Sequence, residues 1–404
     1  MGQIALVLCA MGLFAQDSLS RREAVDRALH IHPLLAGAAG RIAATEGLRQ
    51  QAGLLPNPRL FLQVENLRAT GQPGLQYGQE VDHFAYLSNT FESASKRQRR
   101  VDFASAGVQR AGLEQELLRR QISGRVALAY WTAAGARRTE ALLEEAVRNF
   151  DGIVEYHRVR VQEGSMAESD LIRIRLEQQR LRIDLNRAHL ESERTRIQLL
   201  REMGQTQFPP VTLTDSVEAS ASRALAGDAD AAVAQRTEVK LARAAMEQAR
   251  ANQRLQTAYA RPNYDALFGY KRTAGFNTVM GGFQMDLPVM NKNQGNIAAS
   301  AAEIRVAESN LAAVEAVVRA EVQATWTEYE IRRRELTELL HPLVSQADET
   351  YRIAEGAYKL GGSDLLRLLD AQRIRIEART AEARGLAGIR QAEAALETAL
   401  GVEP

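Results

Sequence analysis

Helical patterning covers two unusually long stretches of this chain, residues 95–162 and 291–360, and apolar or small side chains recur at coiled-coil spacing within 101–122 and 171–199. Each stretch predicts one helix that reverses at a glycine turn and is followed by a second helical segment, which ends near Gly204 or Gly401. At 1.5 Å per residue, a helix of roughly 65 residues is about 100 Å long, which exceeds a compact domain. The pattern therefore predicts a mainly helical protein built from long helix pairs.

A second period, of two residues, precedes each long helix. Residues 59–66 and 264–271 alternate apolar with polar side chains, and a further alternating segment follows each of them, at 81–91 and 278–287. Each half of the chain therefore supplies one β-hairpin with an apolar and a more polar face. The polar face of the second hairpin carries Asp265, Lys271, Gln284 and Asp286.

The two sets of elements arise from a duplication. Thr90–Ala104 aligns without gaps with Asp286–Ser300, and Trp131 aligns with Trp326 about 195 residues later. The chain has only two tryptophans, so their equivalent positions strengthen the match. The expected parts, in chain order, are a signal peptide at 1–15, an N-terminal helix at 16–58, a hairpin at 59–91, a long helix, turn and return helix at 95–204, an irregular connection at 205–227, a helix at 228–260, a hairpin at 261–288, and a second long helix, turn and return helix at 291–404.

Local signals mark several of these boundaries. Ser20 followed by Glu23 is a capping box that predicts the start of the first helix. In the two glycine turns, glycine permits a tight reversal, and Asp170, Ser363 or Asp364 is expected to cap the helix that follows.

The N-terminal segment predicts export. Residues 4–15 form an apolar run that is too short to span a membrane but suits the core of a signal peptide. The only cysteine, Cys9, lies inside this run, so lipidation of Cys9 remains an alternative to cleavage after Ala15. No later run of 18 apolar residues occurs, so a membrane role would have to use β-strands.

Charge and motif content exclude several function classes. The 51 basic and 50 acidic residues are interleaved and give a net charge of +1, which does not favour nucleic-acid binding. No glycine-rich phosphate loop or nucleophile elbow occurs, so the chain is not expected to be an enzyme or to hold a cofactor. The six histidines form no ligand-spaced cluster, so no metal site is expected.

Four amphipathic strands are too few to form a closed β-barrel in a membrane. They cannot close a barrel alone, and an open sheet edge in lipid leaves backbone groups unpaired at several kcal/mol each. Three copies would supply twelve strands, with the Asp265, Lys271, Gln284 and Asp286 face lining water. The alternative from periodicity alone is a soluble hairpin packed on a helix.

The order of these parts resembles the TolC-type outer membrane efflux proteins, also called outer membrane factors, over essentially the whole chain after the signal peptide. The segments that carry the resemblance are GLLPNPRLFLQVEN (53–66), LSNTFESASKRQRR (87–100), FQMDLPVMNKNQGNI (283–297), EGSMAESDL (163–171) and LGGSDLL (360–366). The resemblance implies a homotrimer, in which a 12-stranded outer membrane β-barrel stands on a long α-helical periplasmic barrel. Its function would be a passive exit duct of a tripartite efflux system.

The resemblance also assigns partners and residues. It implies contact with outer membrane lipid, with a periplasmic adaptor protein and, through the adaptor, with an inner-membrane pump. The implied adaptor-contacting residues are Gly164, Ser165, Asp170, Leu171, Gly361, Gly362, Ser363 and Leu365. Asp364 and Asp370 would form acidic rings at a periplasmic aperture, where Arg367 departs from the acidic pattern of the family.

The cargo is less specified. Residues 56–66 and 95–100 look most like the cobalt-zinc-cadmium cation-efflux branch, which implies heavy-metal cations as substrates. The same duct would equally serve drug efflux or type I protein secretion, because cargo is selected mainly by the pump. A soluble coiled-coil scaffold is the remaining alternative; it explains the helices and leaves the four amphipathic strands unexplained.

Overall fold

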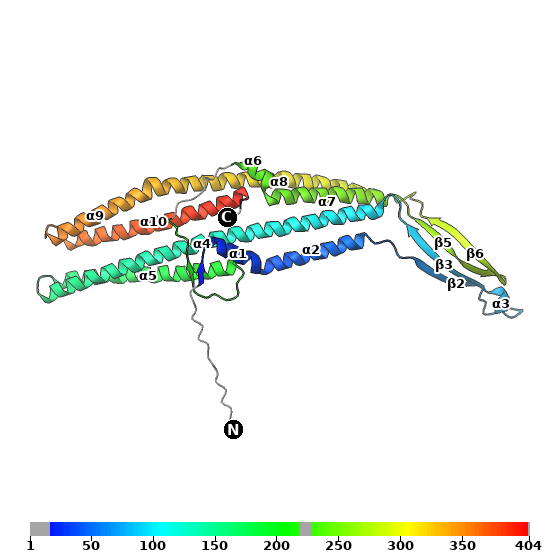
Figure 1. The fold of residues 1–404 in the computed structure, drawn as a ribbon, viewed down its shortest axis with the longest axis horizontal. Coiled ribbons are helices and arrows are strands. Elements are labelled where there is room, and N and C mark those ends of the chain that lie inside the picture. Colours follow the sequence, from blue (N-terminus) through cyan, green and yellow to red (C-terminus); the bar gives the residue numbers. More distant parts are fainter. Residues whose placement is uncertain (1–16, 219–227, 403–404) are drawn as a thin grey trace, which may run out of the picture. The chain divides into compact units, whose positions relative to one another are not determined.

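The computed structural model describes residues 17–218 and 228–402, which divide into two compact units. The first unit holds residues up to 36, 117–236 and 317 onwards, and the second holds 37–116 and 237–316. Both halves of the duplicated chain contribute to both units, because the two long helical stretches each run through one unit into the other (Figure 1).

The second unit contains an antiparallel sheet of four strands in the order β2-β3-β5-β6 (Figure 1). Its strands are β2 (Arg59–Glu65), β3 (Asp82–Phe91), β5 (Tyr264–Thr273) and β6 (Phe276–Met285). The β5–β6 turn is tight, with Ala274 and Gly275 at positive φ, whereas the β2–β3 connection is long and contains α3 (Tyr77–Glu80). Both predicted hairpins are therefore present, and β3 pairs with β5 to join them.

The two faces of this sheet differ sharply in chemistry. Register places Leu87 of β3 opposite Leu60 of β2 and Phe268 of β5, so apolar side chains from neighbouring strands share one face. Large apolar side chains exposed on that face are Leu60, Leu62, Val64, Leu87, Phe91, Tyr264, Phe268, Tyr270, Val279, Phe283 and Met285. Nothing in the described residues covers this face, and we call it the apolar face.

Long helices make up most of the remaining structure. They are α4 (Lys96–Gln162), α5 (Glu168–Glu202), α8 (Gln294–Arg334), α9 (His341–Lys359) and α10 (Leu365–Leu400). The prediction of one very long helix per half holds for α4, whereas the second stretch contains a π-helical turn, η1 (Glu335–Leu340), between α8 and α9. Pro342 explains the turn, because proline lacks the N–H that the α-helical ladder needs and clashes with the preceding turn.

Two shorter predicted helices are each broken in the structure. The N-terminal helix expected at 16–58 is α1 (Arg21–Ile31) and α2 (Pro33–Ala52), because His32, which precedes a proline, is extended. The helix expected at 228–260 is α6 (Ala229–Gln235) and α7 (Thr237–Tyr259). Here Arg236 leaves the helix, and its buried guanidinium donates to the Ala399 carbonyl at 2.7 Å and to Glu321 at 2.9 Å. The capping box of Ser20 and Glu23 is confirmed.

The structure contains a small parallel sheet that the sequence did not predict. β1 (Asp17–Leu19) pairs with β4 (Val211–Leu213), so part of the connection predicted to be irregular is a strand. The fully buried Tyr130 of α4 holds both strands, because its hydroxyl donates to the Leu19 carbonyl and accepts from the Asp215 N–H, each at 3.0 Å. Three residues per strand are too few for a periodic signal to appear in the sequence.

The core of the first unit lies where α1, α4, α5 and α10 meet. Ile122, Tyr130 and Trp131 of α4 pack there with Leu199, Leu200 and Met203 at the end of α5. In the described part of the chain, no helix is long and apolar enough to cross a bilayer. The predicted signal peptide at 1–15, with Cys9, lies outside the described residues.

Candidate functional site

The two glycine turns, residues 163–167 and 360–364, have the same backbone geometry. Gly164 and Gly361 adopt φ of +73° and +77°, a left-handed conformation that an L side chain rarely adopts. In each turn the residue after the glycine donates its N–H to a carbonyl five residues back, from Ser165 to Arg160 at 2.9 Å and from Gly362 to Ala357 at 2.8 Å. This hydrogen bond satisfies a carbonyl in the last turn of each helix, and the left-handed glycine ends α4 and α9.

The helices that follow the turns start differently. Asp364 is the N-cap of α10, and its carboxylate accepts from the Arg367 N–H at 3.0 Å, as predicted. The N-cap of α5 is Ala167, which makes no side-chain capping bond, and Asp170 lies inside the first helical turn. The expectation that Asp170 or Ser363 caps a helix is therefore wrong.

Two residues expected to contact a partner are instead buried inside this chain. Leu171 is 6% exposed and Leu365 is 8% exposed, so these side chains hold the turns in place from within. Gly164, Ser165, Gly361 and Gly362 are exposed, as a contact surface requires. The large apolar side chains that remain exposed beside the second turn are Leu360, at 89%, and Leu366, at 58%, neither of which was expected to contact a partner.

A buried hydrogen bond between α4 and α9 connects the two helices that lead into the turns. His157 of α4 is buried; its Nδ1 lies 2.7 Å from the Ile153 carbonyl oxygen and its Nε2 lies 2.8 Å from the Tyr358 hydroxyl on α9. Since the Ile153 carbonyl can only accept a hydrogen bond, Nδ1 carries the hydrogen and donates it, and the Tyr358 hydroxyl donates to Nε2 of a neutral imidazole. Burial lowers the pKa of His157, which favours this neutral form. Leu365 and Tyr358 also pack on the apolar residues of α4 and α5, so the two halves meet here.

The three aperture candidates have different surroundings. Asp364 is exposed and caps α10, Arg367 is exposed one turn later, and Asp370 pairs with Arg373 at 2.6 Å. Of the two acids, Asp370 is therefore partly neutralised by a cation on its own helix. Asp364 has no ion-pair partner in the described structure.

Charged side chains pair across the two helix pairs, between α4 and α5 and between α9 and α10. The nearly buried Glu140 of α4 accepts from Arg137 at 2.8 Å and pairs with His189 of α5 at 2.6 Å. Burial by itself raises the pKa of Glu140, but hydrogen bonds from His189, Arg137 and Ser192 outweigh it and hold that pKa below its ordinary value. In the other pair, Asp348 of α9 accepts from Arg375 and Arg379 of α10, at 2.7 and 2.9 Å.

The Glu140–His189 pair should make stability depend on pH. The hydrogen bond to Glu140 raises the pKa of His189, so its stabilisation is complete below the ordinary histidine pKa of about 6.5 and is lost as pH rises through the raised value. Arg137 and Glu193 also face the imidazole, with opposite effects. We expect His189→Gln to lower the melting temperature more at pH 5.5 than at pH 9, measured by circular dichroism in detergent. An equal loss at both pH values would contradict this assignment.

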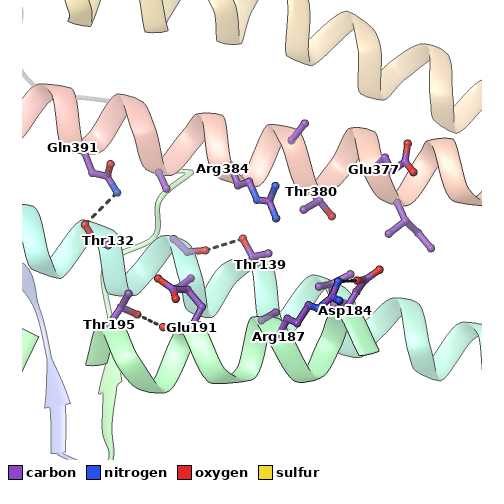
Figure 2. A pocket seen from close by; sticks show the side chains of 17 residues that line it. Thr132, Thr139, Asp184, Arg187, Glu191, Thr195, Glu377, Thr380, Arg384 and Gln391 are labelled. Atoms are coloured by element: carbon purple, nitrogen blue, oxygen red, sulfur yellow. Dashed lines mark hydrogen bonds and ion pairs between the residues drawn. The ribbon is translucent and has the colours of Figure 1, made fainter. Parts of the chain in front are cut away.

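A pocket of about 690 Å³ lies between α4, α5 and α10 (Figure 2). Its lining combines charged residues, such as Arg187 and Arg384, with small residues and threonines. The hydroxyls of Thr139 and Thr195 donate to carbonyls of their own helices, at 3.0 and 2.8 Å, rather than to a base. This lining offers no activated nucleophile, and the described residues contain no group of three potential metal ligands.

The predicted lumen residues largely share one face of the sheet. Asp265 lies opposite Gln284, and Lys271 follows on the same face of β5, because residues of equal parity point the same way. Asp265 is not free, since it accepts from Thr90 at 2.5 Å and from Arg59 at 3.2 Å. Asp286 lies just beyond the end of β6.

Comparison with known proteins shows the fold. No family model matches the sequence, and no curated protein matches it either. Among solved structures, the chain resembles a membrane protein from Pseudomonas aeruginosa (18% identity, TM-score 0.77, 95% of this chain and 90% of that one). It also resembles the MtrE outer membrane channel of Neisseria gonorrhoeae in its open state (17%, 0.78, 95% and 89%) and the outer membrane protein VceC of Vibrio cholerae (18%, 0.73, 95% and 96%). The predicted fold class, a duplicated and mainly helical chain with a four-stranded sheet, is confirmed: it is the fold of outer membrane channels.

Proposed function

We propose that this chain is one protomer of an outer membrane exit duct in a tripartite efflux system, of the TolC type. The observation that carries the proposal is the sheet: one face exposes large apolar side chains to the surroundings, while the other carries charged and amide groups. A sheet with one lipid-compatible face and one hydrated face is what the wall of a water-filled membrane pore requires. The fold shared with solved outer membrane channels supports the same conclusion.

The sheet also supports assembly into a homotrimer. In the described structure β2 and β6 each pair with one strand only, so each leaves a row of backbone groups open along one edge. Pairing β6 of one copy with β2 of the next would satisfy these groups, and three copies would give twelve strands. α5 adds a second self-association surface, because Leu176, Ile183, Leu190 and Ile197 recur every seven residues and are all exposed.

The glycine turns are the proposed periplasmic end, where an adaptor protein would dock and connect the duct to an inner-membrane pump. Gly164, Ser165, Gly361, Gly362 and Ser363 would offer backbone and hydroxyl groups. Leu360 and Leu366 would supply the apolar contacts, because both are exposed next to these groups. Leu171 and Leu365 would act only by holding the turns.

The cargo is proposed only as a class of small solutes or polypeptides delivered by the pump. The resemblance of residues 56–66 and 95–100 to the cobalt-zinc-cadmium branch favours heavy-metal cations. A duct conducts ions without binding them, so this proposal needs no metal site in the chain. Drug efflux and type I protein secretion use the same architecture and are the alternatives.

A soluble coiled-coil scaffold is the alternative from another class. It would have to keep a contiguous apolar sheet face in water, with Leu62 74% exposed and Val279 78% exposed. Such patches are rare on soluble monomers and mark sites that meet lipid or protein. The exposed apolar face therefore favours the membrane duct.

Asp364 is the proposed source of cation selectivity at the periplasmic aperture. Three such carboxylates around one axis would focus a negative potential on the passage. Since asparagine caps helices as well as aspartate does, Asp364→Asn removes the charge and keeps the cap. We expect its reversal potential in a salt gradient to shift toward zero, while Asp370→Asn, whose acid is already paired with Arg373, shifts less. Unchanged selectivity in Asp364→Asn would rule out this role.

The duct itself is tested by mass and by vesicle permeability. Purified in detergent, the protein should have the mass of a trimer by light scattering. Reconstituted into lipid vesicles, it should release a trapped small fluorophore and retain a large dextran, because a pore of this kind discriminates by size. A monomer that stays in solution without detergent and releases nothing would favour the scaffold.

A further inference from the structure

Four aromatic side chains lie on the hydrated face of the sheet: Phe276 lies at the start of β6, and the other three are neighbours on β2 and β3. Phe61 of β2 lies opposite Tyr86 of β3, and Phe84 lies two residues from Tyr86 on the same face. Register with β5 places Phe84 opposite Lys271 and Tyr86 opposite Gly269, on the side that also carries Asp265. We call Phe61, Phe84 and Tyr86 the aromatic band.

The rings of this band are arranged as a surface rather than as a core. Phe61 and Tyr86 stack with centroids 4.8 Å apart at an interplanar angle of 14°, and Phe61 is still 38% exposed. Gly269 adds no side chain beside Tyr86, and a Cβ built there would lie 2.4 Å from the Tyr86 Cβ. Tyr86 therefore lies close against Gly269, and the Phe61 ring is the part of the band that is exposed on this side of the sheet.

A cation stands beside the band. The Lys271 ammonium lies 5.2 Å from the centroid of the Phe84 ring, a cation–π contact. In the described structure Lys271 has no carboxylate within ion-pair distance, in contrast to Arg59, whose partner is Asp265. The positive charge of Lys271 is thus held next to the half-buried Phe84 ring and remains available.

Sheet stability alone does not account for this arrangement. The apolar face already supplies the side chains that lipid or packing would cover, and it lies on the other side of every strand. Phe84 and Tyr86 are half-buried, but Phe61 stays 38% exposed on the hydrated face, so its ring presents apolar area to water. Rings combined with a lysine are the groups that recognise a flat apolar molecule with a negative charge.

We propose that Phe61, Phe84, Tyr86 and Lys271 form a binding site for planar aromatic anions on the inner wall of the duct. The aromatic ring of the ligand would stack on the exposed Phe61 ring of the Phe61–Tyr86 pair, and its carboxylate would pair with the Lys271 ammonium. The site rests on the proposed function, because that function makes this face the lumen. It implies that the wall retards aromatic acids relative to simple ions.

Reversible block of single-channel current by benzoate tests the site, with cyclohexanecarboxylate as the non-planar anion and benzylammonium as the aromatic cation. We expect benzoate to block at the lowest concentration. Phe61→Leu keeps an apolar side chain and removes the ring, so it should weaken benzoate block roughly 2- to 10-fold. Lys271→Gln should weaken it about threefold and should leave benzylammonium block unchanged or stronger.

Phe268→Leu is the matched control, because it makes the same change on the apolar face, and it should leave the block unchanged. Equal block by benzoate and cyclohexanecarboxylate, or equal loss in Phe61→Leu and Phe268→Leu, would overturn the site while the conductance steps still support the duct. If no conductance appears, the proposed duct is contradicted, and calorimetry of benzoate with the detergent-solubilised protein tests the site separately. Binding that Phe61→Leu weakens would support the site. Absence of binding would overturn it.

Discussion

Gly135→Ala is expected to destabilise the protein by about 2 kcal/mol, although alanine is the better helix former. Gly135 lies in α4 where that helix meets α10, and a Cβ built at Gly135 would lie 2.3 Å from the Ala387 Cβ. Neither methyl group has a torsion that relieves such a clash, so the two helices must separate. The loss should appear as a lower guanidinium midpoint in detergent, followed by circular dichroism.

Two further variants separate this clash from a general effect of the substitution. Gly152→Ala makes the same change in the same helix, where nothing lies within 4 Å of the added Cβ, and should be neutral or stabilising by up to about 1 kcal/mol. Ala387→Gly added to Gly135→Ala should recover most of the lost stability. If Gly135→Ala behaves like Gly152→Ala, the close approach of α4 and α10 is wrong.

Tyr130→Phe should also cost about 2 kcal/mol, because it deletes one buried hydroxyl that holds two strands. Burial raises the pKa of Tyr130 to about 12, in keeping with a hydroxyl closed off from water. Without it the Asp215 N–H loses its acceptor, whereas the Leu19 carbonyl still accepts from the Thr214 N–H at 3.1 Å. Hydrogen exchange should therefore accelerate at the Asp215 amide.

Tyr156→Phe is the matched change for this prediction. Tyr156 lies on the same helix but is 55% exposed, so losing its hydroxyl should change stability by less than about 0.5 kcal/mol. Similar denaturation midpoints for Tyr130→Phe and Tyr156→Phe would show that β1 and β4 are not anchored by Tyr130.

The sequence predicted those parts of the fold that repeat a short period many times. The helical patterning of 95–162 places α4 at Lys96–Gln162, and strand alternation places β2 at Arg59–Glu65. Elements without a repeating period were missed, namely the three-residue strands β1 and β4. The helix breaks were missed as well, although Pro33 and Pro342 carry a usable local signal.

The candidate site was predicted in position more than in detail. Glycines fixed both turns, because Gly164 and Gly361 are needed for positive φ. Which leucine is exposed and which is buried depends on how the two halves pack, so Leu365 was expected to be exposed but is buried, while the exposed Leu360 was given no role. The aromatic band was not predicted, because alternation along one strand assigns each residue to a face but does not show which residues of neighbouring strands lie opposite. Only the register brings Phe61 opposite Tyr86.

Single-channel recording in a planar lipid bilayer tests the central claim, that copies of this chain enclose a water-filled passage through a membrane. The detergent-purified protein should produce discrete current steps of uniform size, since each inserted particle would add one passage of fixed diameter. A protein that inserts into the bilayer or stays in solution without producing any step would contradict the duct.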